Sequence, residues 1–249
     1  MFRRVSISCF SAAAAFGLTS IPANASNQVK IDWYSVSPAF ADFDYPPCGT
    51  YNCGQYYYNA NPEVMVGPLS GGRPVVSAAN PAGLAEGPGN PLQWWTPSAG
   101  VTFEGATVQP LPVYQNMFLP QGTGNTDAYA FQTAIFSATL HVGAGGGTIT
   151  YGGDDDMFLA LNGDIVDQVG GIHPFGALDT YNVSPGNYAM DVFFADRHVV
   201  GAVADLQLLG NITTGVPEPS TWGMMLLGFA GLGFAGFRKA KTSRALSAA

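Results

Sequence analysis

Residues 152–173, GGDDDMFLALNGDIVDQVGGIH, decide how the middle of this chain folds. Asn162-Gly163 separates two short apolar runs, and Asn-Gly between extended segments is typical of a type I′ hairpin, because both central residues of that turn need positive φ. The pattern predicts strands over 157–161 and 164–169 joined by this turn. Three aspartates precede the hairpin, and two glycines with a histidine follow it, which indicates a polar site at one end of a β-sheet.

Strand-like segments recur on both sides of this hairpin. They are predicted over residues 29–36, 101–103, 128–142, 148–151, 188–195 and 202–209. With a period of two, Tyr129, Phe131, Thr133 and Ile135 share one face of their strand, and His141 in the same segment is expected at the surface. Residues 68–100 are rich in Gly, Pro and Ser and predict turns with short strands. No segment of the domain combines a helical period with cap signals, so we predict an all-β sandwich or barrel.

Both ends of the chain carry targeting features. Residues 1–25 contain two arginines, an Ala-rich apolar stretch and an A-x-A cleavage site, the pattern of a secretory signal peptide, with a retained signal anchor as the alternative. Residues 222–237 are uncharged and precede four basic residues, which predicts one transmembrane helix with a cytoplasmic tail. A buried core helix is the alternative there.

The remaining domain, residues 26–215, is strongly acidic. It holds sixteen acidic and three basic residues, a formal net charge of −13. Such a surface disfavours binding to nucleic acid through phosphates and suits cations bound by oxygen ligands. Cys48 and Cys53 are the two cysteines of this domain, and in an oxidising compartment they are predicted to form a local disulfide. Two thiols binding a metal are the alternative, without further ligands nearby.

The aspartate run is the candidate metal site. Calcium takes six to eight oxygen ligands, and clustered carboxylates repel one another unless a cation or water compensates them. In a regular strand Asp155 would point away from its two neighbours, so several carboxylates reach one ion only if the backbone turns, as Gly152-Gly153 would permit. The hairpin residues would add oxygens if its tip folds toward the run. The candidate ligands are Asp154, Asp155, Asp156, Asn162 and Asp164. A solvated acidic turn is the alternative, and zinc is disfavoured because the three histidines are far apart.

Three segments of the chain resemble the fibro-slime domain, a PA14-like β-barrel module of secreted and surface proteins. They are the G-D-D-D…N-G hairpin over 153–163, a D-x-G-G-x-H-like corner over 167–173 and an F-(Y/F)-A-E-R-H-like strand end over 193–198. Weaker matches over 40–44, 66–74, 94–95 and 118–120 extend the resemblance over most of the mature chain. The sequence departs from the pattern at Gln168, at Asp196 and at Gly201-Ala202.

This resemblance implies a PA14-like β-sandwich or barrel with a calcium site. Two consecutive aspartates joined by a cis peptide, either Asp154–Asp155 or Asp155–Asp156, would hold the ion, and the ion would bind sugar hydroxyls. His173, Arg197 and His198 lie in the matching segments and are candidate ligand-binding residues. The alternatives are that Arg197 pairs with carboxylates and that His173 packs within its loop.

The C-terminal segment over 216–244 resembles a PEP-CTERM sorting signal. The motif residues are Val216, Pro217, Glu218 and Pro219, followed by the apolar span and the basic tail. The resemblance implies recognition by an exosortase, cleavage near the motif and delivery to the envelope surface or extracellular matrix of a Gram-negative bacterium. Such proteins usually accompany exopolysaccharide production.

These features together predict an exported, non-catalytic surface protein that binds extracellular polysaccharide through calcium. The alternative is a structural matrix protein in which calcium only stabilises the fold or is absent. An enzyme is disfavoured because the chain has no G-x-S-x-G elbow, and because adjacent carboxylates do not easily flank a scissile glycosidic bond.

Overall fold

The computed structural model describes residues 27–43, 63–80, 83–117, 130–176, 178–198 and 201–215. All regular elements within these residues are β-strands, which confirms the predicted all-β class. In chain order they are β1 (Gln28–Val36), β2 (Gly67–Pro68), β3 (Val101–Pro110), β4 (Val113–Asn116), β5 (Phe131–Asp154), β6 (Asp156–Leu161), β7 (Asp164–Val169), β8 (Asp179–Val183), β9 (Gly186–Ala195) and β10 (Val203–Gly215).

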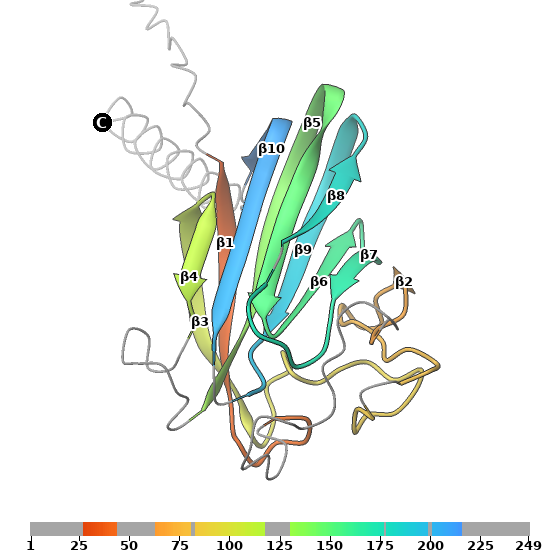
Figure 1. Ribbon diagram of the computed structural model, residues 1–249, viewed down its shortest axis with the longest axis vertical. Coiled ribbons are helices and arrows are strands. Elements are labelled where there is room, and N and C mark those ends of the chain that lie inside the picture. The colour runs from red at the N-terminus through yellow and green to blue at the C-terminus, as the bar shows by residue number, and fades with distance from the viewer. Residues whose placement is uncertain are drawn as a thin grey trace, which may run out of the picture.

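The long strand β5 gives the molecule its two layers (Figure 1). Thr133, near its start, pairs with Ala195, and Asp155, just after its end, donates its backbone N–H to the Ala195 carbonyl. Both ends of β5 therefore meet at Ala195, so the strand reverses direction through its glycine-rich segment 143–147. The sequence predicts two separate strands here, and the structure joins them into one strand that passes from one layer to the other.

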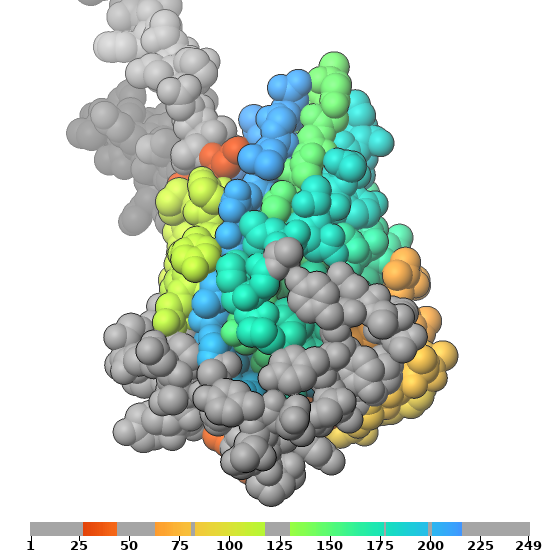
Figure 2. Space-filling view, viewed as in Figure 1, coloured from red at the N-terminus to blue at the C-terminus, as the bar shows by residue number. Residues whose placement is uncertain are grey.

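The strands that pair with β5 also change from one layer to the other next to its segment 143–147. Residues 203–210 of β10 pair with 147–154 of β5, whereas residues 212–215 pair with 139–142. On the other side, β8 pairs with the second half of β5 and β9 with the first half. One layer thus has the order β4-β10-β5-β8, and the other has the order β2-β7-β6-β9-β5-β1-β3. Figure 2 shows β5 and β10 running side by side to the same end of the molecule.

The middle of the second layer, at β6, is buried on both faces. Met157 and Leu159 of β6 face the first layer, whereas Phe158 and Ala160 face the loops and short bridges of residues 63–101. This loop layer contributes two fully buried indoles from residues 94–95, and full burial of one side chain such as Phe158 contributes about 1.5–3 kcal/mol. Cover on both faces explains why β6 is apolar from Met157 to Leu161 and why the second half of β9, from Val192 to Ala195, is apolar as well.

The structure agrees with much of the predicted strand pattern. Phe131 and Ile135 lie in the same core cluster, and the Thr133 hydroxyl donates to the Trp94 carbonyl on that face. The hairpin has φ of 53° at Asn162 and 84° at Gly163, as a type I′ turn requires. Strands β4 and β8, which are short and have mixed patterns, are not predicted.

Several predictions lie outside the described residues. They are the signal peptide over 1–25, the disulfide between Cys48 and Cys53, the transmembrane helix over 222–237, the motif residues Val216 to Pro219, and Tyr129. Within the part of the chain that the structure describes, no helix is long and apolar enough to cross a membrane.

Candidate functional site: a buried aspartate run

The three aspartates occupy the point where the chain passes from one layer to the other. Asp154 ends β5 next to β10, and Asp156 begins β6 in the second layer. The peptide bond between Asp154 and Asp155 is cis, which is one of the two pairs that the resemblance implies. The turn is made by the aspartates themselves. Gly152 and Gly153, at which the sequence suggested the turn, remain within β5.

All three carboxylates are buried. Asp154, Asp155 and Asp156 are 5%, 1% and 0% exposed, so the alternative of a solvated acidic turn is wrong. A single segment that follows β7 supplies a backbone donor to each of them in reverse order. The N–H of Gly171 donates to Asp156 Oδ1, that of His173 to Asp155 Oδ1 at 3.0 Å, and that of Phe175 to Asp154 Oδ2 at 3.1 Å.

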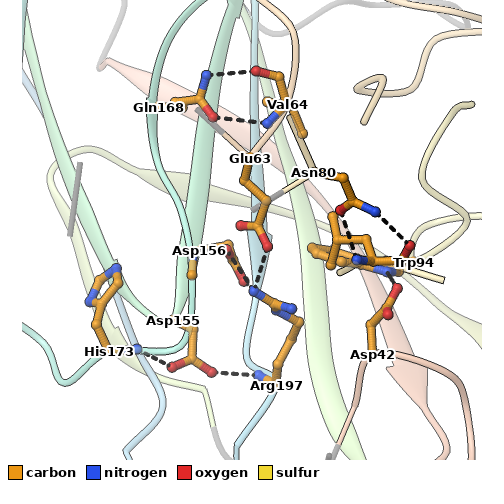
Figure 3. Close-up of polar contacts among 12 residues, drawn as sticks. Asp42, Glu63, Val64, Asn80, Trp94, Asp155, Asp156, Gln168, His173 and Arg197 are labelled. Atoms are coloured by element: carbon orange, nitrogen blue, oxygen red, sulfur yellow. Dashed lines mark hydrogen bonds and ion pairs between the residues drawn. The ribbon is translucent and has the colours of Figure 1, made fainter. Parts of the chain in front are cut away.

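Arg197 compensates the charge at the Asp156 end of the run (Figure 3). Its Nε and Nη2 donate to Asp156 Oδ2 and Oδ1 at 2.6 and 3.2 Å, and Nη2 also donates to Glu63 Oε1 at 2.9 Å. The guanidinium carbon lies 4.7 Å from the centre of a Trp94 ring, a cation–π geometry. Because Glu63 and Trp94 belong to the loop layer, this buried cluster connects that layer to the sheet.

The electrostatics divide the cluster into charged and neutral acids. Burial works against the Asp156 carboxylate, but the charge of Arg197 and its hydrogen bonds hold the pKa of Asp156 below its usual value. Burial raises the pKa of Glu63 well above its usual range, and the neighbouring Asp156 charge adds to the rise. Although burial disfavours a charged guanidinium, the two carboxyls raise the pKa of Arg197. Asp156 and Arg197 thus form the ion pair that the electrostatics favour most, and burial disfavours the charged form of Glu63 beside them.

The Asp154 end has no such cation against it. Burial raises the pKa of Asp154, partly offset by the Phe175 N–H, by the neighbouring Asp155 side chain and by nearby His173 and His198. Asp154 Oδ1 is buried and accepts no hydrogen bond from the described residues. Gly201 closes over this carboxylate, since a Cβ there would lie 1.9 Å from Asp154 Oδ2.

Asp155, between these two ends, accepts no hydrogen bond from the Arg197 guanidinium, although the charge of Arg197 acts to lower its pKa. Its Oδ1 and Oδ2 accept the backbone N–H groups of His173 and Arg197, at 3.0 and 2.7 Å. Burial and the charges of the two flanking aspartates raise the pKa of Asp155 well above its usual value. Each of its oxygens accepts one hydrogen bond, so a lone pair remains on each for another partner.

Two of the predicted metal ligands lie elsewhere. Asn162 and Asp164 are at the far end of β6, six residues from Asp156, which corresponds to roughly 20 Å along a strand. Asn162 Oδ1 accepts the Ala189 N–H there, and Asp164 is exposed. The prediction that the hairpin tip joins the aspartates is wrong, because strand pairing with β9 keeps β6 extended.

The predicted ligand-binding residues have mainly internal contacts. Arg197 is 3% exposed and fully engaged, so it is a structural partner of carboxylates and not a displayed ligand contact. His173 is also buried, with its N–H bound to Asp155 and its Nδ1 3.1 Å from the Pro174 carbonyl. His198 is half-buried, and its backbone N–H donates to Asp196 Oδ1 at 3.3 Å. Sequence reasoning missed Glu63, which lies 134 residues before Arg197 and has no local signal.

The metal-binding capacity of this site rests on few side chains. Among the described residues, no group of three or more His, Cys, Asp or Glu side chains is arranged to hold a metal ion. Asp156 is already bound by the guanidinium. Asp154 and Asp155 together offer one oxygen without a donor and others with a free lone pair, which fits calcium if backbone or ligand oxygens complete the shell.

A comparison with protein families identifies the C-terminal segment. Residues 215–239 match the PEP-CTERM protein-sorting motif. The chain therefore carries this motif, which indicates export and sorting to the cell surface in bacteria and implies processing by an exosortase.

Comparisons with individual proteins give more distant similarities. Protein psiR of Dictyostelium discoideum is 37% identical over 60 residues, which are 22% of this chain and 6% of that protein. A PA14 sugar-binding domain from an RTX adhesin is similar over 76% of this chain and 91% of its own, with 11% identity and a TM-score of 0.32. The PA14 domain of the MpAFP antifreeze protein is similar over 78% and 93%, with 14% identity and the same TM-score.

Proposed function

We propose that this chain is an exported surface protein whose aspartate site binds calcium and, through it, hydroxyl groups of extracellular polysaccharide. The observation that carries the proposal is Asp154 Oδ1, a carboxylate oxygen that is buried and accepts no hydrogen bond from the described residues. Leaving a buried acceptor without a partner costs about 1–3 kcal/mol, more for a charged group, so a bound cation would remove a penalty that the protein alone retains.

Asp154 and Asp155 would hold the ion. Their backbone hydrogen bonds to residues 171–175 and to Arg197 fix both carboxylates in position before any ligand arrives. Bound calcium would supply positive charge and open coordination positions for hydroxyl oxygens. Asp156 would not take part, because its oxygens are already bound by Arg197.

A structural role without carbohydrate is the alternative. Two observations favour a structural role in which the aspartates connect the layers. Arg197 already binds Asp156, and each of the three aspartates receives a backbone donor from residues 171–175. In that case calcium would stabilise the fold or be absent, and no glycan would bind.

Thermal unfolding of the full chain with calcium and with EDTA tests the metal. A ligand of the folded state at one hundred times its Kd adds about 2.7 kcal/mol, so calcium should raise the Tm. Asp154→Asn should abolish this rise while costing little in EDTA, because burial already disfavours the charged form of Asp154. Asp164→Asn is the matched control on the exposed hairpin and should respond to calcium as the natural protein does. Equal melting curves in calcium and EDTA would contradict the proposal.

A glycan array probed in calcium and in EDTA then tests the carbohydrate. Signals that need calcium and disappear in Asp154→Asn support the binding module. A calcium-dependent Tm without any calcium-dependent glycan signal would leave the structural role.

A further inference from the structure

A second polar site lies at the opposite end of the molecule from the aspartates. There, β5 and β10 turn from one layer into the other beside the start of β9, and the three strands line an open hollow of about 430 Å³. His141 in this hollow is eight residues along β5 from Thr133, which pairs with Ala195 beside the aspartates. At about 3.4 Å per residue, roughly 27 Å separates the two places. Figure 1 shows the turns of β5 and β10 at the upper end and the loop layer at the lower end.

The hollow is organised by one row of side chains across three strands. Asn187 of β9 and Thr213 of β10 both pair with His141 of β5, on its two sides. Paired residues of antiparallel strands point to the same face, with Cβ atoms about 4.5–5.5 Å apart. All three are exposed, and His141 Nδ1 lies 2.8 Å from Asn187 Oδ1, which fixes two of the side chains against each other.

Asn211 lies next to this row, at the turn of β10. Its Nδ2 donates to the Ala144 carbonyl at 2.8 Å, so its amide is anchored to the turn of β5. Its Oδ1 is an acceptor that none of the hydrogen bonds among the described residues uses. Four neutral hydrogen-bonding side chains from three strands therefore surround one hollow.

The chemistry of the lining selects the class of ligand. No residue of the lining is an Asp, Glu, Lys or Arg, so the hollow has neither a carboxylate for a metal ion nor a permanent cation for an anion. The acidity of the whole domain further disfavours anions. No aromatic or large exposed apolar side chain is present to hold a flat apolar ligand. Closely spaced neutral donors and acceptors suit a neutral polyhydroxylated molecule.

We propose that this hollow is a second, metal-independent binding site for a neutral saccharide of one or two sugar units. His141, Asn187, Asn211 and Thr213 contact its hydroxyls. Together with the aspartate site it would make the domain bivalent, able to connect two polysaccharide chains, and this consequence rests on the proposed function. The hollow itself does not depend on calcium, so the two sites can be tested separately.

Amide chemical shifts of the ¹⁵N-labelled full chain, titrated in EDTA, test the second site. The probes are the methyl glycosides of glucose, mannose, galactose and fucose at millimolar concentrations, with glycerol as a control for weak polyol contact. We expect saturable shifts for at least one glycoside at residues 141–143, 187 and 211–213. Thr213→Ala and His141→Ala should each weaken this binding about tenfold, the loss of one hydrogen bond.

Matched variants separate the inference from the proposed function. Thr102→Ala removes an equally exposed threonine on β3 and should leave the titration unchanged, as should Asp154→Asn. Binding at the hollow without any calcium-dependent glycan binding would support the second site and remove the first. No saturable shift at the hollow for any glycoside, or shifts confined to residues near Asp154, would overturn the inference.

Discussion

The Asp156 end of the aspartate run and the Asp154 end, two residues away, are equally buried but differently compensated. At Asp156 a guanidinium makes two hydrogen bonds to the carboxylate, and the same guanidinium also donates to Glu63. At Asp154 only one backbone N–H donates to the carboxylate among the described residues. The difference shows that one run of identical residues can combine a structural ion pair with a carboxylate that has one oxygen without a donor.

Removing the cation at the compensated end should have the largest effect. Arg197→Met would leave Asp156 as a buried charge without a partner, and breaking a buried pair in this way costs about 3–5 kcal/mol. Urea unfolding at neutral pH measures the loss. Arg197→Lys should recover part of it, because a lysine restores charge but not the two-point contact. A loss below 1 kcal/mol for Arg197→Met would show that the Asp156 end is no better compensated than the Asp154 end.

The two acids that share Arg197 should respond differently to neutralisation. Asp156→Asn removes the charged partner of a buried guanidinium and should cost about 2–4 kcal/mol. Glu63→Gln should cost less than about 1 kcal/mol, because burial raises the pKa of Glu63 and so disfavours its charged form, and glutamine preserves an acceptor for Arg197. Equal losses of unfolding free energy in the two variants would contradict the assignment of the charge to Asp156.

The close packing at the Asp154 end can be separated from backbone strain. Gly201 and Gly163 have the same φ of 84°, but a Cβ at Gly201 would meet the Asp154 carboxylate, whereas at Gly163 nothing lies within 4 Å. Gly163→Ala therefore measures the strain of a left-handed backbone alone, about 1 kcal/mol. Gly201→Ala should cost roughly 1–3 kcal/mol more and should also remove the effect of calcium on the Tm. Equal costs would mean that the carboxylate moves aside freely.

A smaller effect concerns a carboxyl pair in the loop layer, away from the aspartate run. Burial raises the pKa of Glu86 to about 7, and the neighbouring Asp42 carboxyl contributes to the rise as the second cause. The stability that protonated Glu86 contributes is complete below its unfolded pKa near 4.5 and is lost as the pH rises through 7. Because Glu86 is partly exposed, the change should be of order 1 kcal/mol. Unfolding measured between pH 4.5 and 8 should lose this slope in Glu86→Gln and keep it in Glu104→Gln.

The sequence predicts the local elements well. The two short apolar runs over 157–169 and the positive φ that Asn162-Gly163 favours are properties of neighbouring residues, and the structure confirms the hairpin that they predict. The resemblance to fibro-slime domains implies the cis peptide within the aspartate run. The strand over 188–195 is likewise present as β9, extended by two residues at its start.

The site depends on contacts that no local pattern contains. Glu63 reaches Arg197 across 134 residues, and its role follows from a loop layer that folds onto the sheet. The prediction that Asn162 joins the aspartates fails because β6 stays extended between them. Within the aspartate run, Asp154 Oδ1 differs from the other carboxylate oxygens by its missing donor among the described residues, which three-dimensional packing determines.

The two ends of the folded domain are joined to each other. Thr214 accepts the Gln28 N–H and donates its hydroxyl to the Gln28 carbonyl, and its own N–H donates to the Asn27 side chain. The chain thus enters and leaves the domain at one place, directly before the sorting motif that begins at residue 215. Thr214 pairs with Leu140 of β5, seven residues from the strand position that meets the aspartates, so the aspartate site lies at the end of the domain away from both of its termini.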